Sequence, residues 1–236
     1  MMIKPDPKGF QNLWGFNNID YNHKKGIYIF TLLGIIMVKR TLLIPGKYYH
    51  IFNRGINREN IFLEEKNYHH FLKLYAKYIT PIADTFAYCL LRNHFHLLIR
   101  IKENEDLSGF QNPLGLKAPS QAFSNLFNAY AKAINRAYQR TGSLFEHPFK
   151  RVHITSNTYI LQLVAYIHQN PQKHGFVEDF RNWLYSSYSI LASTKPTNLP
   201  REEVQSWFNG QGGLVNYHKE QITESKLQPI MLDDFD

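Results

Sequence analysis

The sequence predicts an α+β fold in which helices pack on an antiparallel sheet. Four short segments are expected to be strands, and two of them, 47–55 and 92–100, alternate with the period of a strand. Three longer segments repeat their apolar residues every three or four positions, as amphipathic helices do. The predicted order is strand, helix, strand, strand, helix, strand, helix. This order is typical of a ferredoxin-like sandwich, an antiparallel sheet with helices on one face.

The first half of this pattern lies between residues 47 and 101. A strand is expected at 47–55, where KYYHIFNRG alternates and ends at a glycine. A helix is expected at 64–79, because its apolar residues have helical spacing at Tyr68, Phe71, Leu72 and Tyr75. The segments DTFAYCLLR and HFHLLIRI then predict two strands joined around Asn93.

The second half begins after a polar segment, 102–121, whose glycines and prolines predict a long loop. A helix is expected at 120–141, with a core stripe formed by Phe123, Phe127, Tyr130 and Ile134. A strand is expected at 143–154. The last helix is expected to begin at Asn157 or Thr158 and to stop near Asn170, because Pro171 disfavours helical geometry at the residue before it.

Composition narrows the class of protein. The 236 residues include 44% hydrophobic residues, enough for a core, and suit one domain with extensions. A net charge of +8 indicates an anionic partner, either nucleic acid or a membrane surface. The single cysteine, Cys89, excludes an intrachain disulfide and a cysteine-rich zinc site. We therefore expect an intracellular, cytoplasmic protein.

The predicted domain is flanked on both sides. We expect an N-terminal extension of doubtful role at 1–36, a domain at 37–192 and a C-terminal tail at 193–236. The apolar run 27–38 is too short to span a bilayer and lacks a small-residue cleavage site, so it predicts neither a transmembrane helix nor a signal peptide. Met37 is a plausible natural beginning of the domain.

Two histidines lie one residue apart in the segment RNHFHLLIR. On a strand, His94 and His96 face one side and Phe95 and Leu97 the other. Imidazoles about 7 Å apart on a rigid strand can converge on one metal ion. The alternative is a half-buried strand whose polar face carries histidines, and the short motif leaves both open.

The last predicted helix carries a second candidate group. At 100° per residue, Tyr159, Tyr166 and Asn170 project together beside the buried stripe. Two histidines and an amide oxygen would make an open site for Mg²⁺ or Mn²⁺, with Zn²⁺ as a substitute in vitro. A tyrosine beside that cation becomes a better nucleophile toward a phosphodiester. The alternative is a tyrosine that covers the core edge and an asparagine that caps the helix.

Basic residues gather in the second half of the domain. Between Lys132 and Ile154 there are five Lys or Arg and a single acid, Glu146. This imbalance favours phosphate binding over an ordinary solvated face. We expect DNA contacts from Arg54, Lys132, Arg136, Arg140, Lys150 and Arg151. A GxxxxGK phosphate loop does not occur, so no nucleotide cofactor is expected.

Four segments together resemble a known family. NHFHLLI resembles the HUH signature of single-tyrosine transposases, specifically the REP-associated tyrosine transposases. YYHIFNRGINRENIF resembles the first strand and loop of that branch, and GSLFEHPFKR its fourth strand. YIHQNPQKHGFV, followed by WLYSSY, resembles its Tyr-Ile-x-x-Asn-Pro helix and trailing segment. The resemblance covers about residues 41–192, with the motifs in the family's order.

The resemblance implies an HUH transposase domain and a metal-dependent transesterase that cleaves and rejoins single-stranded DNA near hairpins through a 5′-phosphotyrosine. It assigns the nucleophile to Tyr166 and the ligands of Mg²⁺ or Mn²⁺ to His94, His96 and Asn170. The implied partner is single-stranded or hairpin DNA. The sequence leaves the oligomeric state open between a monomer and a homodimer.

The chain also departs from the family pattern. Arg92 stands where relatives often carry proline, the loop 102–121 is long, and residues 1–36 have no counterpart. Two other functions are therefore considered. One is a non-cleaving hairpin or single-strand DNA-binding protein of the same fold. The other is a replication or conjugation nicking enzyme, although those usually carry more histidine ligands or paired tyrosines.

Overall fold

The computed structural model contains two separate antiparallel sheets in the residues that it describes, which are 18–22, 27–32, 35–103 and 119–220. The first sheet has three strands in sequential order: β1 (Asn18–Asn22), β2 (Ile27–Leu32) and β3 (Ile35–Arg40). The apolar run 27–38 therefore supplies β2 and the start of β3. The boundary expected at Met37 falls inside β3, where Met37 pairs with Phe30.

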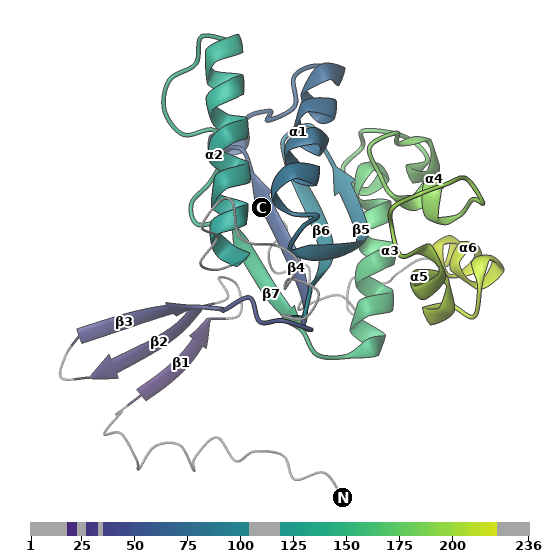
Figure 1. Cartoon of the computed structure of the whole chain (residues 1–236), viewed down its shortest axis with the longest axis horizontal. Helices are drawn as coiled ribbons and strands as arrows, with labels where there is room; N and C mark the ends of the chain where they lie inside the picture. Colours follow the sequence, from purple (N-terminus) through teal and green to yellow (C-terminus); the bar gives the residue numbers. More distant parts are fainter. Residues whose placement is uncertain (1–17, 23–26, 33–34, 104–118, 221–236) are drawn as a thin grey trace, which may run out of the picture.

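The second sheet is built from the predicted domain. It has the order β5-β6-β4-β7, and each neighbouring pair is antiparallel. The register between β4 and β6 places Phe52 opposite His96. This sheet and its helices confirm the predicted α+β class (Figure 1). The strands are β4 (Tyr48–Arg54), β5 (Ala83–Leu90), β6 (His94–Ile101) and β7 (Lys150–Ile154).

Helices α1 (Glu65–Tyr78) and α2 (Pro119–Ala137) lie side by side on one face of the sheet (Figure 1). The aromatic ring of Phe71 meets that of Tyr130 edge-on at 5.1 Å between centroids, and both side chains are fully buried. Such edge-to-face pairs stabilise a core beyond their buried area. The predicted stripe of α2 is buried as expected at Phe123, Phe127, Tyr130 and Ile134.

Helix α3 (Asn157–Lys173) packs on the opposite face of the sheet, which differs from the expected layout with helices on one face. The strands are apolar on both sides, because Leu97 faces the core under α1 whereas Leu98 faces the core under α3. A sheet with two apolar faces must be covered on both.

The chain continues into short helices beside α3 (Figure 1). These are η3 (Phe180–Asn182), α4 (Tyr188–Leu191), α5 (Arg201–Trp207) and α6 (Gln211–Lys219). Val204, Phe208 and Leu214 are buried in the same apolar cluster as α3. The predicted C-terminal tail, 193–236, thus contains two helices that contribute to the core.

Three element boundaries were predicted incorrectly, and the first is the end of α2, which stops at Ala137 and not at 141. The strand expected at 143–154 is limited to Lys150–Ile154, because Pro148 has no N–H to donate to a ladder. The last helix continues past Asn170 to Lys173, with Pro171 inside its final turn. The N–H of His174 still donates to the carbonyl of Asn170 at 3.0 Å, so the turn closes around the proline. The loop predicted at 102–121 lies mainly outside the described residues.

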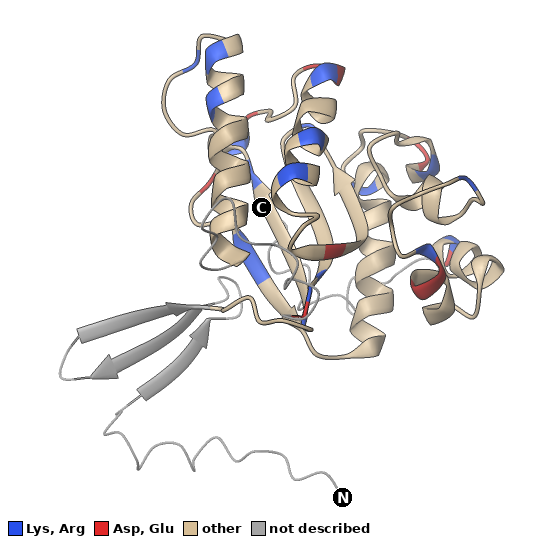
Figure 2. Cartoon of the chain, in the orientation of Figure 1, with Lys and Arg blue, Asp and Glu red and all other residues tan. Residues whose placement is uncertain are grey.

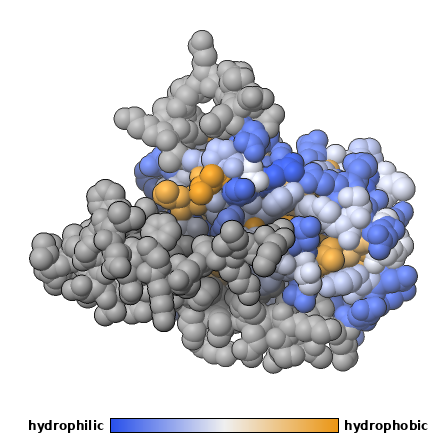
Figure 3. Space-filling model, turned by 90° about the horizontal axis from the view of Figure 1, so that it is seen from below, coloured by the Kyte–Doolittle hydropathy of each residue, from blue (hydrophilic) through white to orange (hydrophobic). Residues whose placement is uncertain are grey.

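Where described residues are visible from below, they are mostly hydrophilic, with apolar atoms in small separate areas (Figure 3). Lys and Arg residues occur at several positions along α1 and α2 (Figure 2). Among the described residues, no helix has the length and apolar character needed to cross a membrane. Cys89 is fully buried, and burial raises the pKa of its thiol.

Candidate functional site

Strand β6 presents His94 and His96 on the sheet face that α3 covers. Their ring centroids are 5.2 Å apart, and both side chains are buried. Phe95 and Leu97 point the opposite way, into the core under α1 and α2. The alternation expected from the sequence therefore holds. The burial of Phe95 and Leu97 on the opposite face fixes the strand that carries both imidazoles.

Helix α3 brings two polar groups against this histidine pair. The Oδ1 atom of Asn170 lies 3.3 Å from Nε2 of His94. One turn earlier, the ring of Tyr166 meets that of His96 nearly at right angles, at 5.5 Å between centroids. The structure thus collects His94, His96, Asn170 and Tyr166 at one place within a single chain.

The nitrogen atoms of the two histidines have different partners. Nδ1 of His94 lies 2.7 Å from Oδ1 of Asn93, and Nδ1 of His96 lies 2.9 Å from Nε2 of His50. Nε2 of His94 faces the amide oxygen of Asn170. Nε2 of His96 is buried and has no hydrogen-bond partner within the described part of the chain. A buried nitrogen of this kind requires a partner, and a metal ion is one that an imidazole lone pair can bind.

These donors fit a divalent cation. Two imidazole nitrogens and one amide oxygen are a mixed set that suits Mg²⁺, Mn²⁺ or Zn²⁺. The described residues contain no cluster of three or more His, Cys, Asp or Glu side chains arranged for a metal, because the third donor here is the amide of Asn170. Further ligands would have to come from the bound substrate or water.

Electrostatics keep His96 in the form that a metal requires. Burial holds the pKa of His96 well below its usual range, and the nearby His50, His94, His174 and Lys173 lower that pKa further. His96 is therefore neutral near pH 7, and a neutral imidazole offers a lone pair to a cation.

Two further residues at this site were missed from the sequence. The Nζ atom of Lys173 lies 5.5 Å from the ring centroid of Tyr166, and the ring of His174 lies 4.9 Å from that of His94. Both residues close the final turn of α3. Their signal was present in the segment NPQKH, where two basic residues follow Asn170 within one turn.

The predicted DNA-binding residues are distributed unevenly. Arg54 forms an ion pair with Glu146 at 2.5 Å, and Arg140 forms one with Glu59. Arg151 is buried and donates to Oγ of Ser120 at 2.7 Å. These three arginines have structural roles in the chain as it stands, which the sequence did not predict.

The other three predicted basic residues lie on different sides of the sheet. Lys132 and Arg136 are exposed on α2. Lys150 shares the α3 face with the histidine pair, because Phe52 pairs in register with both Lys150 and His96. The Nζ atom of Lys150 lies 5.8 Å from the Phe52 ring centroid. Lys150 is thus on the face of the site, whereas α2 covers the opposite face.

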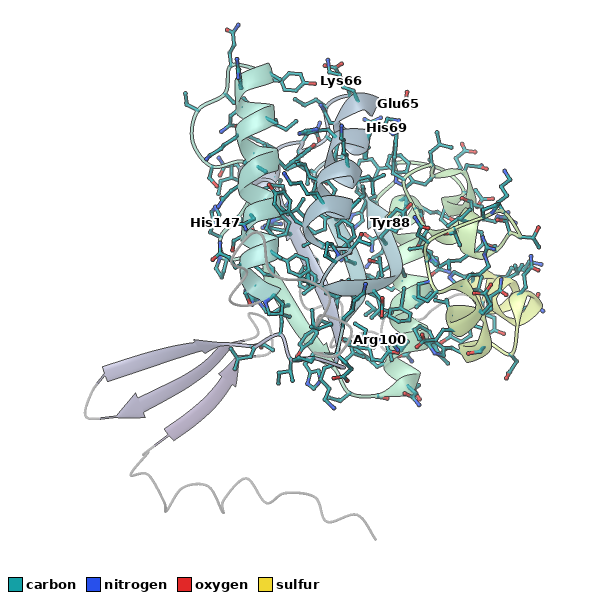
Figure 4. The ribbon with its side chains drawn as sticks, in the orientation of Figure 1. Glu65, Lys66, His69, Tyr88, Arg100 and His147 are labelled. Atoms are coloured by element: carbon teal, nitrogen blue, oxygen red, sulfur yellow. The ribbon has the colours of Figure 1, made fainter. Side chains whose placement is uncertain are left out.

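The same face of β6 carries a cluster of ion pairs, in place of histidines, toward the end of the strand. Arg100 lies at the lower end of β6 in Figure 4 and forms ion pairs with Asp84 at 3.1 Å and Glu203 at 2.9 Å. Glu203 belongs to α5, so this cluster ties the C-terminal helices to the sheet. Its carboxylates balance the guanidinium, which makes it a structural cluster.

The sequence was compared with family models and with known proteins. No family model matches the sequence. Part of the chain is 29% identical over 110 residues to a Haemophilus influenzae protein that is named as a REP-associated tyrosine transposase. This match covers 44% of the chain and 58% of the relative, so it spans little more than half of the relative's length.

The fold also has a known counterpart. A solved structure described as the REP-associated tyrosine transposase bound to a REP hairpin aligns with a TM-score of 0.50 and 17% identity. The alignment covers 67% of this chain and 87% of that one. The chain is similar to REP-associated tyrosine transposases. The resemblance predicted from the four motifs is confirmed, and the shared fold agrees with it.

Proposed function

We propose that the chain is a transposase-type strand transferase that cleaves and rejoins single-stranded DNA beside a hairpin. The observation that carries this proposal is the meeting of Tyr166 with His94, His96 and Asn170 at the junction of β6 and α3. The names of the similar proteins support the same reaction and the same kind of DNA.

His94, His96 and Asn170 would hold one divalent ion, Mg²⁺ or Mn²⁺, through Nε2, Nε2 and Oδ1. Such an ion neutralises the charge of a bound phosphodiester and polarises its phosphorus. The three side chains are preorganised for metal binding, since the two histidines come from a rigid strand and Asn170 is fully buried.

Tyr166 is the proposed nucleophile. Its phenolic oxygen forms a bond to phosphorus while the bond from phosphorus to the 3′ oxygen breaks. The phenol loses a proton, and the departing 3′ oxygen gains one. The product is a 5′-phosphotyrosine, which a 3′-hydroxyl can attack in reverse to rejoin the strand without a nucleotide. Lys173, whose ammonium lies over the Tyr166 ring, adds positive charge beside the phosphate.

The DNA path follows from where the cations lie. Lys150 and Lys173 are on the face of the site and would bind phosphates next to the scissile bond. Lys132 and Arg136 would contact a duplex arm that reaches over α2. Arg151, which donates to the uncharged hydroxyl of Ser120, would add to the positive field. Arg54 and Arg140 would bind phosphate only by exchanging their carboxylate partners, Glu146 and Glu59, for the DNA.

A second candidate is a DNA-binding protein of the same fold that does not cleave. Tyr166 is only 3% exposed, so neighbouring atoms must move before a phosphodiester reaches its phenol. A chain in which that movement does not occur would bind a hairpin and leave it intact. The replication or conjugation type of nicking enzyme has less support, since Tyr159 lies two turns before Tyr166 and packs against the apolar cluster under α3.

One experiment separates these functions. The chain is incubated with end-labelled single-stranded hairpin DNA and Mn²⁺, and a denaturing gel then reveals any covalent protein–DNA adduct. We expect an adduct that retains the label from one side of the cut, together with a released strand that bears a 3′-hydroxyl. Hairpin binding without an adduct would favour the non-cleaving protein.

A further inference from the structure

His50 lies on β4, directly beside the strand that carries the histidine pair. Its Nε2 atom is 2.9 Å from Nδ1 of His96, and the side chain is 1% exposed. The two rings are inclined by only 23°, with centroids 5.1 Å apart, so the contact is nearly in the plane of both rings. Phe52 stacks on His50 at 4.5 Å and holds that ring in place.

The contact between His50 and His96 restricts where His96 carries its proton. A neutral imidazole has one N–H and one lone pair. If Nδ1 of His96 carries the hydrogen, it donates to His50 and leaves Nε2 as a lone pair. If Nε2 carried the hydrogen, a donor would be buried without an acceptor within the described part of the chain. The hydrogen bond between His50 and His96 can form in either case, and the form with a bare Nε2 is favoured because it buries no unpaired donor.

We propose that His50 is a positioning residue for the metal site, because its Nε2 accepts from Nδ1 of His96 and keeps Nε2 of His96 available to the cation. This inference rests on the metal site of the proposed function. Metal-binding histidines generally donate their second N–H to an acceptor that fixes ring orientation and tautomer. His50 would act through His96 and would not itself touch the metal.

His94, the other candidate histidine ligand, also has a hydrogen-bond partner at Nδ1, but this partner is a neighbour in the sequence. Nδ1 of His94 is 2.7 Å from Oδ1 of Asn93, the preceding residue. His96 instead receives its acceptor from a strand 46 residues away in the sequence. Each of the two candidate ligands therefore has its Nδ1 occupied by the protein, so Nε2 is the atom of each that would reach the cation. Nε2 of His94 faces Oδ1 of Asn170, the third candidate ligand, at 3.3 Å.

The first test measures the affinity for Mn²⁺ in the full chain by titration calorimetry. His50→Leu removes the acceptor, whereas His50→Gln keeps an oxygen near the position of Nε2. We expect His50→Leu to bind Mn²⁺ about 10- to 100-fold more weakly and His50→Gln to stay much closer to wild type. His153→Leu is the matched control, because His153 lies on β7 beside Tyr49, on the other sheet face, and should leave the affinity unchanged.

The second test needs no metal. In the metal-free protein, the ¹⁵N shifts of the labelled imidazoles report which nitrogen of His96 carries the proton. We expect the proton on Nδ1 in wild type and in His50→Gln, and a mixture of both forms in His50→Leu. A wild-type His96 protonated on Nε2, or an unchanged Mn²⁺ affinity in His50→Leu, would overturn the role of His50.

These readouts separate the inference from the proposed function. Absence of a DNA adduct with normal Mn²⁺ binding would count against the transposase reaction and leave the role of His50 intact. A wild-type chain that binds no Mn²⁺ would remove both the metal site and the proposed role of His50. Unfolding curves of each variant identify any loss of affinity that comes from misfolding, and in that case the His96 proton position in wild type and His50→Gln still decides.

Discussion

The Nε2 atom of His94 lies 3.3 Å from the Oδ1 atom of Asn170, although 76 residues separate them in the sequence. One residue belongs to a strand and the other to a helix that packs across that strand. The contact therefore exists only while α3 is docked on the sheet. Leu163, Val164 and Ile167 provide this docking, since all three are fully buried.

We predict that Tyr166→Phe abolishes the covalent DNA adduct, because the substitution removes the nucleophilic oxygen and keeps the ring. Hairpin affinity should change by less than about threefold, which is under about 1 kcal/mol. Tyr159→Phe is the matched control on the same helix and should form adduct normally. A reversed result, with adduct lost only in Tyr159→Phe, would show that the nucleophile is assigned to the wrong tyrosine.

We predict that His94→Ala, His96→Ala and Asn170→Ala each weaken Mn²⁺ binding by at least about tenfold, because each removes one of three donors. A chelator should stop adduct formation by the wild-type chain. His69→Ala is a suitable control, because His69 is exposed near the start of α1 (Figure 4), and α1 covers the sheet face opposite to the site. Full cleavage in the presence of chelator would rule out a metal-dependent reaction.

The exposed pair Lys132 and Arg136 should contribute to DNA affinity without sequence preference. Replacement of both by Ala is expected to lower affinity for every hairpin tested and to reduce the log–log salt slope by roughly two, about one per phosphate contact. Arg140 is left in place because of its ion pair with Glu59. The same change at Lys73 and Lys77, an exposed pair of equal spacing on α1, tests for a general charge effect. Equal slopes in wild type and the α2 variant would contradict the assignment.

Stability should fall as the solution becomes acidic, because a buried histidine pair joins α3 to α6. Nδ1 of His168 lies 2.8 Å from Nε2 of His218, and Nε2 of His168 lies 2.8 Å from Oγ of Ser187. Burial lowers the pKa of His218 to about 4, although hydrogen bonds to the carbonyls of Leu214 and Val164 oppose this shift. Burial and His218 together hold the pKa of His168 well below its usual range.

The sign of the pH effect follows from these depressed pKa values. The unfolded chain takes up protons near pH 6.5, whereas the folded chain resists protonation until about pH 4 at His218. The stabilisation is therefore complete above pH 6.5 and is lost between about pH 6.5 and 4, by about 3 kcal/mol for His218 alone. Urea unfolding at several pH values measures this slope, and His218→Gln should make it shallower. An identical slope in the variant would contradict this account.

A chain that starts at Met37 should retain the four-stranded sheet and its activity on hairpin DNA. The three-stranded sheet and the four-stranded sheet share no ladder among the described residues, so removal of β1 and β2 leaves the second sheet's hydrogen bonds intact. Thermal unfolding and adduct formation compare the shortened and full chains. Aggregation or a large loss of stability would show that the first sheet supports the core.

Much of the candidate site could be read from the sequence because it depends on local periodicity. Alternation along a strand is enough to place His94 and His96 on one face. Helical spacing is enough to place Tyr166 and Asn170 one turn apart on α3. The strands, the helices and the resemblance to REP-associated transposases were predictable for the same reason, since each depends on contiguous segments.

The remaining features were decided by packing between distant segments. No local pattern indicated that His50 would meet His96, or that Lys173 would lie over the ring of Tyr166. Arg54 pairs with the carboxylate of Glu146, and Arg151 donates to the hydroxyl of Ser120. A buried or half-buried guanidinium is stable only when it has such a partner. Helix α3 packs on the second face of the sheet because that face is also apolar and must be removed from water. Periodicity thus determined which side chains share one face of a strand or helix. Only the burial of apolar surface across the whole chain determined which other residues those side chains contact.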